Sequence, residues 1–197
     1  DYVFDGTKGR YKEDDQPSPL SYYAKTKLMG EEVVTNSLDD ECIIRTSLHG
    51  WNIQDKLSFT EWVITNLRSG RPIPAFIDHF YTPILVNNLA QALLELALLS
   101  FTGVLHVGGA ERASRFEIAS SAAQVFNLNT HLIRPVKIEE AGLLAPRPHD
   151  SSLDTSRAQG LLTSKLLDIE EGLLWMKRLE EDSYVTQLKQ GYAGQGK

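Results

Sequence analysis

The chain has 197 residues, of which 42% are hydrophobic and 23% are charged, and its formal net charge is −6. This length and composition suffice for one domain with a hydrophobic core or for part of a larger domain. The 20 basic and 26 acidic residues are spread along the chain, which argues against a basic face for nucleic acid and against a polybasic membrane anchor.

The first predicted element is the end of a strand, at residues 1–4. A polar loop rich in turn residues then runs to Pro19. Ser18 and Pro19 are suited to the cap and first turn of a helix, which we expect to continue to about Asn36. A short apolar strand begins at Cys42. Cys42 is the only cysteine, so it can form no internal disulfide, and its apolar neighbours predict that it is buried.

The rest of the chain alternates helices with strands. Helices are predicted at residues 59–68, 86–99, 114–126 and 169–179, and strands at residues 104–107 and 132–136. This alternation predicts an α/β architecture. No apolar run is long enough to span a bilayer and no signal peptide is recognisable, so we expect a soluble cytoplasmic protein. The tail from Gln190 to Lys197 is expected to be frayed.

The first helix carries a Tyr-x-x-x-Lys motif, formed by Tyr23 and Lys27. Residues four apart lie on one face of a helix, one above the other. A neighbouring ammonium favours phenolate over phenol, and a tyrosine placed in this way can exchange a proton with a carbonyl oxygen near neutral pH. Tyrosine and lysine at this spacing also recur by chance, so an ordinary exposed pair is the alternative.

Three stretches of the chain match one family pattern. They are Asp1 to Gly6 (D-Y-V-F-D-G), Tyr23 to Glu31 (Y-A-K-T-K-L-M-G-E) and Arg147 to Ser156 (R-P-H-D-S-S-L-D-T-S). With these motifs the chain resembles the extended short-chain dehydrogenase/reductases, and among them the dTDP-4-dehydrorhamnose reductase (sugar-nucleotide-binding) family. Ala24 stands where the family pattern has glycine. The resemblance spans nearly the whole chain.

The resemblance implies the C-terminal part of a Rossmann-like doubly wound sheet, together with a smaller α/β substrate domain. Residues 1–50 would belong to the dinucleotide-binding domain and include the Tyr-x-x-x-Lys helix. Residues 51–190 would form mainly the substrate domain, with some segments returning to the first domain. Residues 191–197 would be a flexible tail.

The activity implied by the resemblance is the reduction of a 4-keto nucleotide sugar with NADH or NADPH. Tyr23 would supply the proton, and Lys27 would hold the nicotinamide ribose. The same family includes the regulatory β-subunit of methionine adenosyltransferase, which keeps the fold and the Tyr-x-x-x-Lys motif. A non-catalytic, NAD(P)-binding regulatory subunit is therefore the alternative, and it is kept open by Leu48 and His79, which depart from the family pattern.

Further site residues follow from the same resemblance. Besides Tyr23 and Lys27, the cofactor would contact Arg45 and Thr46, at the end of a strand where ligands bind in open α/β sheets. The residues implied for the substrate are Val3, Phe4, Leu48, His79 and Arg147.

Two of these residues have structural alternatives. Arg45 could equally form a structural ion pair. The planar guanidinium of Arg147 suits a diphosphate, but it could instead tie its own loop down through Asp150 or Asp154.

The 197 residues contain no G-x-G-x-x-G fingerprint for a pyrophosphate. The nearest imitation, Val107 to Ala110, has two adjacent glycines, and the resemblance places it in the substrate half. The family's carbonyl-polarising Ser or Thr would precede Asp1. We therefore expect a C-terminal part that neither binds a dinucleotide tightly nor catalyses alone, and that associates with itself as a homodimer or with an N-terminal half. The five histidines show no metal-ligand spacing, and His106 is predicted to be a hydrogen-bonded core residue.

Overall fold

The structure is a computed structural model, and it describes residues 1–54 and 56–193. The helices are α1 (Tyr22–Ser37), α2 (Phe59–Arg68), α3 (Val86–Leu98), α4 (Arg115–Val125), α5 (Ser156–Leu161), α6 (Ile169–Glu181) and α7 (Tyr184–Ala193), with short 3₁₀ turns η1 (Thr130–Leu132) and η2 (Ile138–Ala141). The strands are β1 (Cys42–Arg45), β2 (Leu48–His49), β3 (Ile73–Phe76), β4 (Phe80–Tyr81), β5 (Ile84–Leu85), β6 (Gly103–His106), β7 (Ala113–Ser114) and β8 (Ile133–Val136).

The strands form four pairs, of which three are parallel. β1 pairs with β6, β2 with β5 and β3 with β8 in parallel, whereas β4 and β7 are antiparallel. Parallel strands need long crossover connections, and helices α2, α3 and α4 lie within them. The predicted α/β architecture is confirmed.

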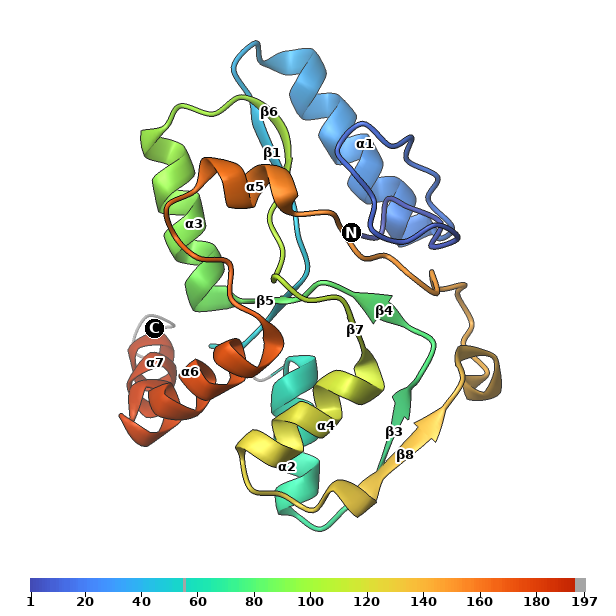
Figure 1. Cartoon of the computed structure of the whole chain (residues 1–197), viewed down its shortest axis with the longest axis vertical. Helices are drawn as coiled ribbons and strands as arrows, with labels where there is room; N and C mark the ends of the chain where they lie inside the picture. Colours follow the sequence, from blue (N-terminus) through green and yellow to red (C-terminus); the bar gives the residue numbers. More distant parts are fainter. Residues whose placement is uncertain (55, 194–197) are drawn as a thin grey trace.

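Two apolar clusters make up most of the core. The larger one joins α2, α4 and α6 to the β3–β8 pair, and the smaller one joins α3, β5, β6 and α5. In Figure 1 the β1–β6 pair lies between α1 and α3, while α2 and α4 lie next to each other in the opposite half of the molecule. A third, small cluster of Val3, Phe4, Tyr11 and Leu153 holds the N-terminal loop against this framework.

The N-terminal segment differs from the prediction in two respects. Residues 1–4 form a turn instead of a strand, in which the Phe4 amide donates to Asp1 O (3.4 Å), and Val3 O accepts from the amide of Ser18 (2.8 Å) within the loop. The helix begins at Tyr22, and its cap is Ser21, whose Oγ accepts from the Ala24 amide (3.2 Å), so the prediction of a Ser18 cap is wrong. The predicted Ser114 cap of α4 is confirmed, and it forms a capping box with Glu117.

Cys42 is exposed, which corrects the prediction of a core thiol. Along β1 the buried side chains are those of Ile43 and Arg45, and the alternation of a strand therefore turns Cys42 outward. At the other end of the chain, helix α7 continues through Gln190 to Ala193, where the sequence predicts a frayed tail. Residues 194–197 lie outside the described residues.

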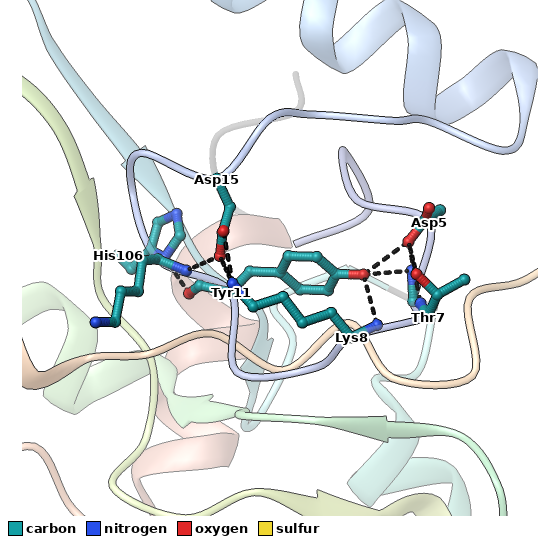
Figure 2. A network of polar contacts seen from close by, with 8 residues as sticks. Asp5, Thr7, Lys8, Tyr11, Asp15 and His106 are labelled. Atoms are coloured by element: carbon teal, nitrogen blue, oxygen red, sulfur yellow. Dashed lines mark hydrogen bonds and ion pairs between the residues drawn. The ribbon is translucent and has the colours of Figure 1, made fainter.

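A polar network centred on Tyr11 fastens the N-terminal loop (Figure 2). The amides of Gly6 (3.0 Å) and Lys8 (3.2 Å) donate to Tyr11 Oη, which donates to Asp5 Oδ1 (2.7 Å). The Tyr11 carbonyl accepts from Nδ1 of His106 (3.0 Å), a fully buried side chain, so the prediction for His106 is confirmed. One side chain thus satisfies two loop amides and one carboxylate.

Replacing Tyr11 by phenylalanine should therefore destabilise the protein by about 1–3 kcal/mol, because the ring stays while three polar groups lose their partner. The free energy of unfolding in urea measures the effect. Tyr22→Phe removes the same atom from a ring that is 82% exposed, and this control should change the free energy by less than about 0.5 kcal/mol. Equal values for the two variants would contradict the role given to Tyr11.

Candidate active site

Three neighbouring cavities share lining residues, and together they are called the groove. The Tyr23 cavity (about 410 Å³) is lined by Asp1, Tyr2, Val3, Tyr23, Lys27, Glu31, Ile43, Ile44, Thr46 and Leu48. The His79 cavity (about 390 Å³) shares Asp1, Tyr2 and Leu48 with it. The Arg147 cavity (about 480 Å³) shares Phe59 and Arg115 with the His79 cavity. These volumes are in the range of small-molecule sites.

Tyr23 and Lys27 lie on consecutive turns of α1 and both line the Tyr23 cavity. The Lys27 ammonium is 5.5 Å from the centroid of the Tyr23 ring, and the ring meets that of Tyr2 edge to face at 6.2 Å. The side chain of Tyr23 is 59% exposed, so the cavity is open to solvent. The four-residue spacing thus places both side chains at the wall of one open cleft.

Two buried hydroxyls next to this cleft have no hydrogen-bond partner among the described residues. They are Thr46 Oγ1, in the Tyr23 cavity, and Ser47 Oγ, in the His79 cavity. Buried polar groups are almost always hydrogen-bonded, so these two hydroxyls have unused hydrogen-bonding capacity beside the cleft. Thr46 is among the site residues expected from the sequence, whereas Ser47 is not. The signal for Ser47 is its place directly after Thr46, beyond the carboxyl end of β1.

Arg45 forms a buried ion pair, which is the structural alternative that the sequence offered for it. Its guanidinium pairs with Glu31 of α1 at 2.7 Å and is only 7% exposed, and it lies 5.2 Å from the centroid of the Phe4 ring. Phe4 is itself fully buried and stacks on Tyr11 at 4.1 Å. The linings of the three cavities include neither residue, and the ligand contacts expected for Arg45 and Phe4 stay predictions. The ion pair ties α1 to β1 one turn beyond Lys27.

Val3, Leu48, His79 and Arg147 line the groove, and their contact with a substrate stays a prediction. Arg147 donates to the hydroxyl of Tyr2 (3.4 Å). Its suggested partner Asp150 pairs instead with Arg112 (2.6 Å), and its other suggested partner, Asp154, accepts from the amide of Ser156 (2.9 Å). The interpretation of Arg147 as a tie within its own loop is therefore wrong.

Arg115 and Tyr2 are site residues that the sequence analysis missed. Arg115 is the first residue of α4, lines two of the three cavities, and stacks over Phe59 at 4.5 Å. A cation in the first turn of a helix is opposed by the helix dipole, so this mismatch was a sequence signal for an anion nearby. Tyr2 lines both the Tyr23 cavity and the His79 cavity.

His79 is almost completely buried between these residues. Its Nδ1 accepts from Arg115 Nε at 3.0 Å, and its Nε2 lies 3.5 Å from Tyr2 Oη. Burial, and then the charge of Arg115, lower the pKa of His79 to about 3. The imidazole is therefore neutral at any working pH.

The adjacent glycines of the 107–110 segment serve backbone packing. The amides of Gly109 and Ala110 donate to the carbonyls of Thr82 and Leu167, both at 3.1 Å. A Cβ on Gly109 would lie 2.4 Å from the carbonyl oxygen of Pro83, so no side chain fits there. With these amides engaged, the segment is no phosphate cradle.

Residues 1–54 and 56–193 show neither a metal-binding cluster nor a membrane span. They contain no group of three or more His, Cys, Asp or Glu side chains suited to a metal ion. None of the helices in this part of the chain has the length and apolarity to cross a membrane.

Comparison with known proteins gives a family match over most of the chain. The family model described as the RmlD substrate binding domain matches residues 1–178. A probable low-salt glycan biosynthesis reductase, Agl14 of Haloferax volcanii, is 32% identical over 177 residues, which are 88% of this chain and 59% of that protein. Methionine adenosyltransferase 2 subunit beta of Xenopus tropicalis is 30% identical over 166 residues, 81% of this chain and 49% of that protein.

Solved structures agree with this match. A hypothetical dTDP-4-dehydrorhamnose reductase from Sulfolobus tokodaii superposes with a TM-score of 0.76 at 42% identity, covering 87% of this chain and 59% of that one. The dTDP-4-dehydrorhamnose reductase of Bacillus anthracis in complex with NADP gives 0.80 at 29% identity, covering 92% and 63%. The chain thus spans between about half and three fifths of the length of these relatives.

Proposed function

The chain belongs to the family of the RmlD substrate binding domain, and from this premise we propose that it forms the substrate half and the Tyr-x-x-x-Lys helix of a nicotinamide-dependent reductase of a 4-keto nucleotide sugar. Its fold is α/β, like that of the Rossmann-like reductases it resembles. The finer assignment is to a short-chain dehydrogenase/reductase that acts on a dTDP-linked sugar.

One observation carries the proposal. Tyr23 and Lys27 share a cavity wall with the buried, unpartnered hydroxyl of Thr46. When bound, NADH or NADPH supplies the hydride. Tyr23 would pass a proton to the carbonyl oxygen of the sugar, and Lys27 would hold the nicotinamide ribose and favour the phenolate after transfer. Thr46 supplies the hydroxyl for the cofactor.

The residue types that line the three cavities, taken one cavity after another, support a nucleotide sugar as substrate. The keto sugar would lie in the Tyr23 cavity against Val3 and Leu48. The diphosphate would lie between Arg115 and Arg147, whose guanidinium groups suit paired phosphate oxygens. In the Arg147 cavity, an apolar wall of Phe59, Trp62, Pro74, Ala75, Phe76 and Val136 would take the base.

Cofactor binding would need a further segment. A pyrophosphate is held by a glycine-rich turn at a helix N-terminus, and the 197 residues encode no such fingerprint. We therefore assign the activity to the full protein that carries this chain and a dinucleotide-binding segment, with the chain inactive by itself.

A regulatory role is the second candidate. The relatives include β-subunits of methionine adenosyltransferase 2 from several vertebrates, at 30–32% identity. Leu48 and His79 depart from the reductase pattern in the substrate pocket. In this case the protein would bind NAD(P) without turning over a sugar.

Oxidation of NADH and NADPH by the full protein, offered dTDP-4-dehydrorhamnose, tests the proposal. We expect oxidation that depends on the sugar nucleotide. Cofactor binding by calorimetry without such oxidation would favour the regulatory role. Failure to bind either cofactor would contradict both functions.

A further inference from the structure

The hydroxyl of Tyr2 stands at the junction of two cavities. Tyr2 lines both the Tyr23 cavity and the His79 cavity, and its ring touches that of Tyr23 edge to face. Its Oη has two polar neighbours, Nε2 of His79 at 3.5 Å and an Nη of Arg147 at 3.4 Å. Both distances are long for hydrogen bonds, so each contact is weak. What the two contacts decide is which groups can donate a hydrogen to Tyr2 Oη and which can accept one.

The tautomer of His79 follows from its other neighbour. Arg115 Nε donates to His79 Nδ1 at 3.0 Å, and a guanidinium has no acceptor. Nδ1 must therefore present a lone pair. A neutral imidazole with an unprotonated Nδ1 carries its hydrogen on Nε2.

The charges around His79 keep the ring neutral. The positive charges of Arg115 and Arg147, and that of His149 when it is protonated, disfavour protonation of His79. The negative charge of Asp150 favours it. Burial acts in the same direction as the cations and is the larger effect. The Nε2 hydrogen is therefore a fixed feature of the site.

Both neighbours of the Tyr2 hydroxyl are consequently donors. His79 Nε2 and Arg147 offer hydrogens to the oxygen, and neither can accept one in return. The hydrogen of Tyr2 Oη is left to point into the groove.

We propose that Tyr2 is a specificity-determining residue, which donates its hydroxyl hydrogen to a substrate oxygen where the sugar joins the diphosphate, and that His79, whose tautomer is set by Arg115, is the positioning residue that fixes this direction. The assignment of that oxygen rests on the proposed function, which places the sugar and the diphosphate in these two cavities. A phenol free to rotate would serve a donor or an acceptor equally. Held as an obligate donor, it selects a ligand with an acceptor oxygen at this point and disfavours one with an apolar or donor group.

Glutamine at position 79 offers a matched test of the positioning role. Its side chain has both groups that the imidazole uses: Oε1 can accept from Arg115, and Nε2 can donate to Tyr2. Leucine is apolar and has neither. His79→Gln should therefore retain the function of the site, and His79→Leu should lose it.

The experiment compares these variants in the full protein by kcat and KM for the sugar nucleotide and by calorimetric titration with dTDP-glucose. Tyr2→Phe should lower kcat/KM and the affinity for dTDP-glucose by about 10–100-fold, the worth of one hydrogen bond to a charged group. His79→Gln should stay within about 3-fold of the wild type, and His79→Leu should fall with Tyr2→Phe. The double variant Tyr2→Phe/His79→Leu should be no worse than Tyr2→Phe alone, because His79 acts through Tyr2.

Several outcomes would overturn the proposal. They are an unchanged Tyr2→Phe protein, effects of Tyr2→Phe and His79→Leu that add in full, and a His79→Gln protein as impaired as His79→Leu. Should His79→Leu fail to fold, Tyr2→Phe and His79→Gln still decide the matter. If the wild type binds dTDP-glucose but reduces no keto sugar, only the reductase activity fails, and the affinities test Tyr2. If the wild type does not bind dTDP-glucose, this proposal falls as well.

Discussion

Replacing Tyr23 by phenylalanine is expected to lower kcat of the full protein by about 10²–10⁴-fold, the usual contribution of a positioned general acid. The ring stays in place beside Tyr2 and Lys27, and only the proton donor is removed. The affinities for the cofactor and for dTDP-glucose should therefore stay close to those of the wild type. Steady-state kinetics and calorimetry separate the two effects.

The neighbouring tyrosine provides a matched control. Tyr22 lies on the same helix, is 82% exposed, and is not among the residues that line the three cavities. Tyr22→Phe removes the same atom and should leave kcat unchanged. If Tyr23→Phe also kept full turnover, Tyr23 would not be the proton donor. The cavity and the family membership do not depend on this result.

Acid should destabilise the protein well before its carboxylates titrate. Burial lowers the pKa of His49 to about 4, and burial together with Arg115 lowers that of His79 to about 3. The unfolded chain has histidine pKa values near 6.5, so between pH 6.5 and 4 it binds more protons than the folded protein. The contribution of these two histidines to the free energy of unfolding is thus complete above pH 6.5 and falls as the pH drops. At pH 5 each histidine accounts for a loss on the order of 2 kcal/mol.

Urea unfolding at pH 7.5 and pH 5 measures this loss. Burial also lowers the pKa of His106, so His79→Gln removes one of three such groups. The loss of stability between the two pH values should therefore shrink by the share of His79, on the order of 2 kcal/mol. His131 is exposed, and His131→Gln is the matched control that should leave the loss unchanged. A wild-type protein equally stable at both pH values would show that these imidazoles are not held neutral.

The elements that the sequence predicts well are those with a long periodic pattern or a clear cap. Helix α4, from its Ser114 cap to the end at Val125, is an example. Strands β2, β4, β5 and β7 have two residues each, too few to show a period, and they exist only because a distant segment pairs with them. Cys42 shows the same limit, because its apolar neighbours do not reveal which face of β1 is covered.

The site residues also fall into those that a local sequence pattern predicts and those that it does not. Tyr23 and Lys27 could be found because the spacing that places them together is local to one helix. Tyr2 and Arg115 could not, since what gives each of them a role is a neighbour far along the chain. Tyr2 is 77 residues from His79 and 145 from Arg147. Arg45 was ambiguous for a related reason, because nothing in its own strand identifies Glu31 as its partner.

These separations also determine when the groove can form during synthesis. The Arg10 amide binds Ser152 Oγ across 142 residues, and β1 and β3 pair with strands that are made about 60 residues later. On the ribosome, Tyr2 must therefore wait for its two polar neighbours, His79 and Arg147, to emerge, although the residues that line the Tyr23 cavity are made early. Folding is slow when long loops must close, because the chain loses conformational entropy before the distant contacts have formed. The nascent chain meanwhile exposes apolar surface that invites aggregation or chaperone binding.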